Sequence, residues 1–243
     1  MQRFFVDKET ISEKQVLITD SRVHQIRDVL RMKIGDEIIV LDNTGIEYHA
    51  KLTNISQKEV AGEIIRKEKC QAEPKTQITL FQSLLAREKF QVVLQKCTEV
   101  GVCNFVPIIT ERSIVRKPEK IKKEKLSRFQ SIITEAAEQS GRATVPSIQN
   151  VVFMSQALSE LNEFDICLYG SILDCSSLKQ ILRDSKFSPE KIALFIGPEG
   201  GFSDSEIEEF SKRAVQPFSL GRRVLRTETA GIVSAAVILY ELD

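Results

Sequence analysis

The first seventy residues contain a segment in which apolar and polar residues alternate. Between residues 46 and 52 every second residue is apolar, which is typical of a half-buried strand. The turn sequence Asp42-Asn43-Thr44-Gly45 separates this segment from an earlier apolar run. Strands are predicted at residues 38–41, 46–52 and 60–64. The pattern indicates a small β-rich domain, which we place at residues 1–70.

One helix is predicted among these strands, at residues 20–32. Val23, Ile26 and Leu30 form its apolar side, and Asp20 or Ser21 can cap its start. Three cationic or titratable side chains share the neighbouring face at helical spacing: His24, Arg27 and Arg31. This face could bind phosphate groups or be an ordinary charged helix surface, and either interpretation fits the spacing.

The pattern changes after a polar linker at residues 68–75. Apolar strands now alternate with amphipathic helices, which predicts an α/β domain with a mainly parallel sheet at residues 71–243. The expected strands are residues 78–83, 105–109, 166–168 and 192–196, and the expected helices are residues 87–100, 118–140 and 229–242. The last helix is apolar almost all round, so its own domain or a second subunit must cover it.

Composition narrows the class of protein. The 243 residues are 42% hydrophobic and 28% charged, as in ordinary globular proteins. No apolar run approaches the roughly 18 residues that a membrane span needs. Residues 1–13 are charged and lack the apolar core of a signal peptide. We therefore expect a cytoplasmic protein with no membrane partner.

Five cysteines and two histidines limit metal and redox chemistry. The cysteine number is odd and no CxxC pair occurs, so we expect neither a disulfide framework nor a metal site. A net charge of zero argues against a nucleic-acid binder. Basic residues nevertheless outnumber acidic ones between residues 76 and 142, and such a segment either faces phosphates or forms a solvated helix surface.

The first strong motif is Gly197-Pro198-Glu199-Gly200-Gly201-Phe202. It follows an apolar strand and precedes a helix whose Ser203 and Glu206 have capping-box spacing. Glycines at this place let the backbone approach a ligand, although a plain tight turn is the simpler interpretation. The motif is neither GxGxxG nor a P-loop, so neither dinucleotide nor P-loop chemistry is indicated.

The second motif lies between Ser219 and Ala230. Gly221 ends a short apolar run, and a loop with three arginines follows before Thr227 or Thr229, either of which can cap the last helix. Arginines beside a helix N-terminus favour an anion. Val224 and Leu225 within the loop indicate that it packs inward.

These two motifs, GPEGGFSDSEI at residues 197–207 and LGRRVLRTETA at residues 220–230, resemble the bacterial 16S ribosomal RNA uridine-N3 methyltransferase family. Three further segments are similar to the same family: QKCTEVG at residues 95–101, TERS at residues 110–113 and EAAEQSGR at residues 135–142. Arg3 and the segment from His24 to Asp36 resemble its N-terminal RNA-binding domain. The resemblance extends over nearly the whole chain.

The resemblance implies a PUA-like β-barrel followed by a SPOUT-type α/β domain with a deep trefoil knot. It also implies a homodimer with the cofactor pocket near the subunit interface. The implied activity is S-adenosylmethionine-dependent methylation of N3 of a specific uridine. The implied substrate is 16S ribosomal RNA or the small ribosomal subunit.

By the same resemblance, loops near the C-terminus hold S-adenosylmethionine. The implied cofactor-binding residues are Leu168, Tyr169, Ile196, Gly197, Pro198, Glu199, Gly200, Gly201, Ser219, Leu220, Gly221, Val224, Leu225 and Arg226. One segment departs from the family, because Tyr169-Gly170-Ser171 stands where the family often has a Tyr-Glu pair.

Methylation of uracil N3 requires loss of a weakly acidic proton. A cationic side chain would stabilise the resulting anion, and Arg142, Arg112 and Arg226 are the candidates, while Glu228 or Glu199 could accept the proton. No covalent cysteine is needed, because nitrogen attacks the methyl carbon directly. The candidate RNA contacts are Arg3, His24, Arg27, Arg31, Arg87, Lys89 and Lys96.

Two other functions remain open at this point. A transfer-RNA methyltransferase of the same fold would share these motifs, and profiling of methylated nucleotides in a deletion strain would distinguish it. A non-catalytic ribosome assembly factor would retain the fold without binding S-adenosylmethionine, although the intact glycine loop argues against this function. A dinucleotide oxidoreductase is least supported, because its fingerprint is missing.

Overall fold

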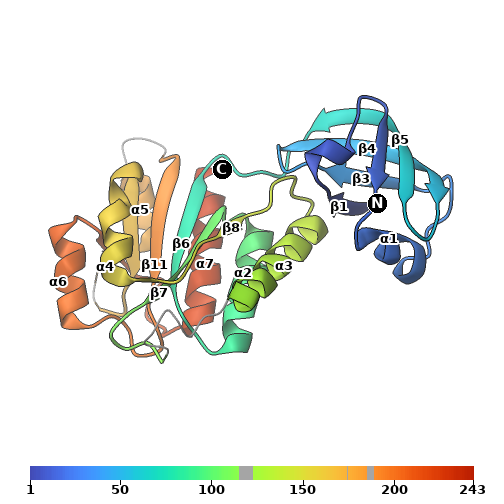
Figure 1. Ribbon diagram of the computed structural model, residues 1–243. Helices are drawn as coiled ribbons and strands as arrows, with labels where there is room; N and C mark the ends of the chain where they lie inside the picture. The colour runs from blue at the N-terminus through green and yellow to red at the C-terminus, as the bar shows by residue number, and fades with distance from the viewer. Residues whose placement is uncertain (115–122, 174, 185–188) are drawn as a thin grey trace. The chain divides into compact units, whose positions relative to one another are not determined.

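The structure is a computed structural model that describes residues 1–114, 123–173, 175–184 and 189–243 (Figure 1). The chain forms two compact units. The first unit contains Met1–Glu73 together with Ala137–Val145, and the second contains Pro74–Ala136 together with Pro146–Asp243.

The first unit is built on a five-stranded sheet in the order β1-β3-β4-β5-β2. Its strands are β1 (Gln2–Phe5), β2 (Gln15–Ile18), β3 (Glu37–Leu41), β4 (Ile46–Ile55) and β5 (Val60–Lys69). β1 runs parallel to β3, and the other neighbours are antiparallel. The three predicted strands are confirmed. β1 and β2 were not predicted, because four residues are too few to establish an alternation.

The predicted helix of this unit is shorter than expected. It consists of α1 (Arg22–His24) and a π-helical turn, η2 (Gln25–Val29), preceded earlier in the chain by the short η1 (Lys8–Thr10). Val23 and Ile26 are buried against the apolar side of the sheet, as the spacing predicts. Arg31 adopts a φ of 53°, in the left-handed region, so the helix cannot continue to Met32.

The segment Ala137–Val145 supplies part of the core of the first unit. Ala137 and Ala143 are buried in one cluster with Phe5 and Leu41. The Phe5 amide donates a hydrogen bond to Glu138 Oε1 at 3.0 Å. The assignment of the first domain to residues 1–70 did not include this segment, since chain order alone cannot show that a distant segment returns to a core.

The second unit contains a parallel sheet in the order β12-β10-β11-β6-β7-β8, with β9 also paired to β7. Its strands are β6 (Gln77–Ser83), β7 (Asn104–Ile109), β8 (Ser147–Ile148), β9 (Val152–Phe153), β10 (Ile166–Gly170), β11 (Lys191–Ile196) and β12 (Gln216–Phe218). All of these pairings are parallel. The expected parallel α/β domain is confirmed.

Helices cover both faces of this sheet (Figure 1). They are α2 (Arg87–Val100), α3 (Lys123–Ser140), α4 (Met154–Ala157), η4 (Leu158–Glu163), α5 (Leu178–Asp184), α6 (Asp204–Lys212) and α7 (Thr227–Leu242). α7 packs against α2, α5, β11 and β6 on one face. On the other face, Met154 of α4 and Phe210 of α6 share a core cluster with Phe81 and Phe195 of the strands.

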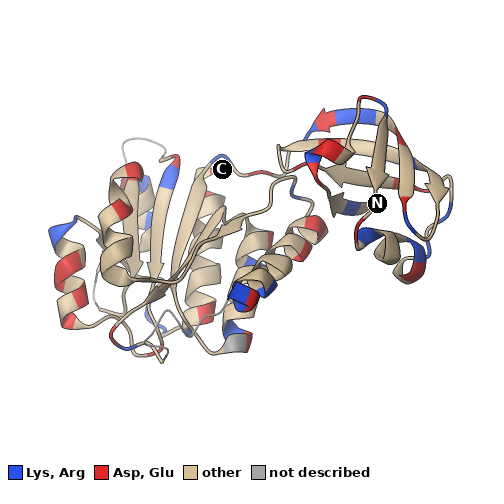
Figure 2. Ribbon diagram, in the orientation of Figure 1, with Lys and Arg blue, Asp and Glu red and all other residues tan. Residues whose placement is uncertain are grey.

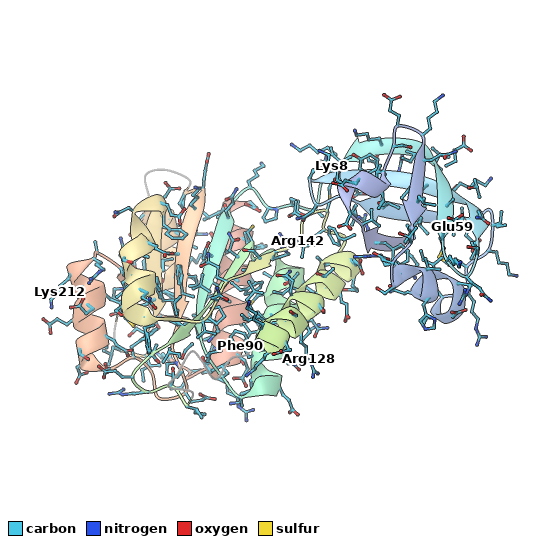
Figure 3. The ribbon with its side chains drawn as sticks, in the orientation of Figure 1. Lys8, Glu59, Phe90, Arg128, Arg142 and Lys212 are labelled. Atoms are coloured by element: carbon cyan, nitrogen blue, oxygen red, sulfur yellow. The ribbon has the colours of Figure 1, made fainter. Side chains whose placement is uncertain are left out.

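α3 lies outside α2, to which it is joined by aromatic packing. The ring of Phe90, on α2, lies 5.1 Å from the ring of Phe129 on α3 (Figure 3). The expected start of this helix near Pro118 falls outside the described residues. Among the helices that the structure describes, none combines the length and the apolar character needed to cross a membrane.

Candidate active site

Three loops leave the same edge of the parallel sheet. β10 lies between β11 and β12, and all three strands run in the same direction, so Gly170, Ile196 and Phe218 end side by side. The Ser171 amide donates to the Phe218 carbonyl at 2.9 Å, which holds the first and third loops together where they begin. Ligands of parallel sheets bind at the carboxyl ends of the strands, so this edge is the candidate site.

The glycine loop after β11 is packed on one side and open on the other. A Cβ on Gly197 would lie 3.2 Å from the Phe202 ring, so glycine permits this close packing. Phe202 in turn packs edge-on against Tyr169 and Phe210 in the core. Gly201 has a φ of 69° and no neighbouring atom within 4 Å of where a Cβ would stand. The loop therefore presents free backbone above an aromatic support.

Arg112 joins the TERS turn to this loop. Its Nη1 donates hydrogen bonds to the carbonyls of Gly200 at 2.9 Å and Phe202 at 3.1 Å. Three buried hydroxyl groups fix the turn itself: the Ser113 hydroxyl lies 2.9 Å from that of Ser83 and 2.8 Å from that of Thr110. The predicted candidate Arg112 thus lies at the site and supports the glycine loop.

The start of α6 is tied to the same turn by Glu206. The predicted capping box is confirmed, because the Ser203 hydroxyl accepts from the Glu206 amide and Glu206 Oε2 accepts from the Ser203 amide. The other oxygen, Glu206 Oε1, accepts from the Glu111 amide at 2.9 Å. One buried carboxylate therefore joins the TERS turn to the end of the glycine loop.

The second motif meets the first through Thr227. The helix cap is Arg226, so the expectation that Thr227 or Thr229 caps α7 is wrong. Thr227 is instead the first helical residue, and its hydroxyl donates to the Gly197 carbonyl. The same hydroxyl accepts from Gln82 Nε2 at 3.3 Å. The Thr227 hydroxyl therefore does not cap its own helix but joins it to the distant residues Gly197 and Gln82.

The loop between Gly221 and Arg226 faces outward. Gly221 has a φ of 107° and open space where a Cβ would stand. The Val224 side chain is 78% exposed, so the expectation that Val224 packs inward is wrong. Only Leu225 is half-buried, while Arg222, Arg223 and Arg226 are exposed. A single half-buried residue therefore attaches the loop, and its cations remain accessible.

Charged groups from three elements meet beside the glycine loop. Lys89 Nζ, in the first turn of α2, lies 3.0 Å from Glu199 Oε1 and 3.9 Å from Glu228 Oε2. Burial raises the pKa of Glu199, but the backbone and Lys89 hydrogen bonds outweigh it, and the pKa lies below its ordinary value. The Glu228 side chain is 15% exposed. Its Oε2 has no hydrogen-bond partner among the described residues.

Arg142 belongs to the first unit, whereas this edge belongs to the second. Its side chain is 3% exposed and lies in the first unit, where Nη2 and Nε contact Glu73 Oε2 at 2.9 Å and 3.3 Å. The same carboxylate accepts from the amides of Ala143 and Thr144. This ion pair orders the turn after α3, and a catalytic role for Arg142 stays a prediction.

The remaining predicted cofactor-binding residues differ in how deeply their side chains are buried. The side chains of Leu168, Tyr169 and Ile196 are buried in the core. The Tyr169 ring stacks on Phe210 at 4.5 Å, and burial raises the pKa of its hydroxyl. A ligand at this edge would therefore meet the backbone of these residues. Pro198 is buried, whereas Ser219 and Leu220 are half-buried.

Comparison with known proteins identifies the family. The RNA methyltransferase domain model matches residues 72–239, and the RNA methyltransferase PUA domain model matches residues 18–65. The Ribosomal RNA small subunit methyltransferase E of Bacillus subtilis is 32% identical over 100% of this chain and 98% of its own. The chain belongs to the small-subunit ribosomal RNA methyltransferase E family.

Two solved structures similar to this methyltransferase E family member contain a cofactor. The methyltransferase E of Neisseria gonorrhoeae, bound to S-adenosyl methionine, has a TM-score of 0.87 and 32% identity, covering 98% of this chain and 96% of its own. A Legionella pneumophila protein with the bound cofactor SAM has a TM-score of 0.87 and 31% identity, covering 97% and 96%.

Most of the predicted RNA contacts of this family member already have acidic partners. Arg3 Nη1 pairs with Glu47 at 2.9 Å, and Lys96 Nζ pairs with Glu99 at 2.8 Å. His24 and Arg27 both contact Asp28, and acidic and basic residues lie side by side along α1 and η2 (Figure 2). Arg31 is exposed. The Arg87 side chain lies outside the described residues. RNA binding by these residues stays a prediction.

One group of metal-type ligands lies together among the described residues. Glu47, His49 and Glu68 offer ligand atoms within 4.8 Å of one another in the first unit. The carboxylates are already paired, Glu47 with Arg3 and Glu68 with Arg66 at 2.9 Å. Arg3 and Arg66 therefore provide positive charge beside these carboxylates.

Sequence analysis missed the residues that join the site segments in this methyltransferase E family member. Gln82, Ser83 and Thr110 are buried polar residues at the carboxyl ends of β6 and β7. The sequence contained a signal for them, because a polar Gln-Ser pair directly follows the apolar Leu80-Phe81 at the end of a predicted strand. Buried polar groups need partners, so such a pair indicates a hydrogen-bonded network at that edge.

Proposed function

We propose that this protein transfers a methyl group from S-adenosylmethionine to N3 of a specific uridine in 16S ribosomal RNA. The observation that carries the proposal is the junction of the two glycine segments at one edge of the parallel sheet, where Thr227 donates to the Gly197 carbonyl. Related structures of similar length contain S-adenosylmethionine. The names of the relatives support the small-subunit ribosomal RNA as substrate.

The residues present fit this cofactor. Free backbone is available at Gly201 and Gly221, where no atom lies within 4 Å of the position that a Cβ would occupy. The backbone of residues 197–201 and 219–226 would hold the nucleoside, next to the buried edge formed by Leu168, Tyr169 and Ile196. Glu228 Oε2, which accepts no hydrogen bond from the described residues, is a buried acceptor that a bound group can satisfy.

Bound S-adenosylmethionine supplies the methyl carbon, whose bond to sulfur breaks as its bond to N3 forms, with the bonding electrons passing to sulfur. Residues of the chain accept the N3 proton and stabilise the negative charge on the uracil. Glu228 accepts the N3 proton, and Glu199 is the alternative acceptor. Arg226 and Arg112 stabilise the negative charge that develops on the uracil, a role also proposed for Arg142.

The other features of the proposal follow from the fold. The 219–226 segment runs from β12, at the end of the sheet order, back to α7 on β11 and β6, and we place the trefoil knot at this crossing. The first unit, as a PUA-like β-barrel, would bind RNA. α7 carries half-exposed apolar residues and Tyr240, which is 88% exposed, and this surface supports a homodimer. Ribosomal RNA as substrate supports a cytoplasmic location.

Primer extension on small-subunit RNA treated with the pure protein and cofactor tests the proposal. Methylation of N3 blocks base pairing, so we expect one strong stop at a uridine. Isothermal calorimetry should show binding of S-adenosylmethionine, which a non-catalytic assembly factor would not show. Methylation lost from transfer RNA alone in a deletion strain would contradict the ribosomal substrate.

A further inference from the structure

The Lys89 ammonium lies between two carboxylates that belong to different segments of the site. Its distances are 3.0 Å to Glu199 Oε1, in the glycine loop, and 3.9 Å to Glu228 Oε2, in the first turn of α7. An ammonium has three N–H donors and can serve both carboxylates at once. Lys89 therefore links the glycine loop to α7 through electrostatic attraction. The Thr227 hydroxyl links the same two segments through a hydrogen bond.

The two carboxylates are not equivalent. Glu199 is hydrogen-bonded to Lys89, and its side chain is 40% exposed. Glu228 is more deeply buried, and its Oε2 accepts no hydrogen bond from the described residues. A buried acceptor without a donor is destabilising. Glu228 Oε2 is therefore available to a hydrogen-bond donor on a bound ligand. The Lys89 ammonium is close enough to compensate the negative charge of this carboxylate.

Other charged groups belong to the same segments of chain. On the segments around the edge they are Glu88, Glu111, Arg112, Arg222, Arg223 and Arg226. Arg112 is engaged with the carbonyls of Gly200 and Phe202, and Glu111 accepts from Ser205. Within the described ranges, no ion pair at or below 4.0 Å joins these arginines to Glu228, so Lys89 is its nearest cationic partner there.

We propose that Lys89 is a positioning residue of the methyl-transfer site, which keeps Glu199 and Glu228 together as two carboxylates and leaves Glu228 Oε2 free to take the N3 proton of a docked uracil. The inference rests on the proposed function. Lys89 was expected to contact RNA phosphate, whereas the geometry commits its ammonium to the two carboxylates. Without that ammonium, the negative charges of Glu199 and Glu228 would lie near one another uncompensated, and like charges favour protonation of a carboxylate.

The decisive experiment measures kcat against pH for Lys89→Met, Lys89→Arg and the wild-type protein, with small-subunit RNA and S-adenosylmethionine. We expect Lys89→Met to lower kcat by up to about tenfold on the acidic side of the pH profile. Activity should recover as the pH rises, with the midpoint raised by about one unit. Lys89→Arg should keep the wild-type midpoint. Cofactor affinity, measured by calorimetry, should change less than about threefold for either variant.

A matched control exists on α6. Lys212 also pairs with two carboxylates, Glu208 and Glu209, each at 3.0 Å, and lies at the outer side of the helix (Figure 3). Lys212→Met should leave kcat and its pH dependence unchanged. The double variant Lys89→Met with Glu199→Gln removes one of the competing carboxylates, so its pH midpoint should return toward that of the wild-type protein. A purely structural role for Lys89 would not produce this return.

Several outcomes would overturn the inference. One is an unaltered kcat and pH profile in the folded Lys89→Met variant. Another is a rise in KM for RNA with kcat unchanged, because this result would assign Lys89 to phosphate binding. Lys89→Gln provides the same comparison if Lys89→Met does not fold. A wild-type protein that methylates no RNA would remove the proposed function and this inference with it. If the wild-type protein is active and the Lys89 variant has the same kcat and pH profile, the inference is wrong but the proposed function stands.

Discussion

Thr227 and Gly197 are separated by 30 residues of chain and joined by a hydrogen bond from the Thr227 hydroxyl to the Gly197 carbonyl. Thr227→Val keeps the shape of the side chain but removes the hydroxyl that donates to this carbonyl. It also removes one of the three acceptors of Gln82 Nε2, the others being the carbonyls of Ser83 and Ile196. Such losses cost about 1–3 kcal/mol. We expect affinity for S-adenosylmethionine to fall about tenfold, measured by calorimetry. Thr227→Ser keeps the hydroxyl and should bind normally, and equal losses in both variants would contradict this role.

Gly231 in α7 leaves room for Gln82. A Cβ at Gly231 would lie 2.9 Å from Gln82 Oε1, which is too close for an ordinary contact. Helix propensity alone predicts that Gly231→Ala stabilises the protein by about 1 kcal/mol. We expect the opposite sign, a loss of roughly 1–3 kcal/mol, because the buried amide must shift. Thermal unfolding measures the sign.

Shortening Gln82 provides the control for this clash. In a Gln82→Ala background the added methyl group has space, so Gly231→Ala should cost less than it does in the wild-type protein. Additive losses in the double variant would show that the two residues do not interact.

Arg112 is expected to act on cofactor binding through the glycine loop. Arg112→Met removes both hydrogen bonds to the carbonyls of Gly200 and Phe202. We expect affinity for S-adenosylmethionine to fall about tenfold, and hydrogen exchange of the amides in residues 200–203 to become faster. Arg213→Met, which removes a surface pair with Glu209, is the control and should leave both measurements unchanged. Unaltered exchange in Arg112→Met would count against the support role.

Glu73 should make the stability of the first unit depend on pH. Burial raises the pKa of Glu73, but hydrogen bonds from Thr144 and the Arg142 guanidinium outweigh it, and the pKa lies below its ordinary value of 4.5. A lowered pKa in the folded state stabilises the protein above about pH 4.5, and this contribution is lost as the pH falls through the lower value. The melting temperature should therefore drop on acidification.

Glu73→Gln tests the source of that drop. The variant should be less stable at neutral pH by about 1–3 kcal/mol, because the buried Arg142 loses its charged partner. Its melting temperature should then fall less steeply on acidification than that of the wild-type protein. Parallel curves for the two proteins would locate the acid sensitivity elsewhere.

Local patterns were sufficient to predict most of the elements. The expected strands at residues 78–83, 105–109, 166–168 and 192–196 follow from runs of apolar residues. The capping box of Ser203 and Glu206 was recognised from spacing alone. The family motifs also placed both glycine segments at the site. These features depend on residues near in sequence, which is why they could be predicted.

Relations between distant segments could not be predicted in this way. Thr227 has the residue type of a cap, but a carbonyl 30 residues away is its partner. Arg142 lies in a family motif, yet its buried pairing with Glu73 depends on where the turn after α3 folds. Val224 is apolar and exposed, because hydrophobicity does not fix the direction of a side chain in a loop. Each of these features depends on the tertiary structure and not on the local sequence.

The return of residues 137–145 to the first unit determines how this protein can be divided. A fragment that stops at Glu73 would lose the cover over Phe5 and Leu41, and Glu73 would lose Arg142. Apolar side chains exposed in this way favour aggregation. An isolated first unit would therefore require residues 137–145 to be grafted back through a new linker, so this unit is not an N-terminal cassette that can be exchanged between proteins by simple fusion.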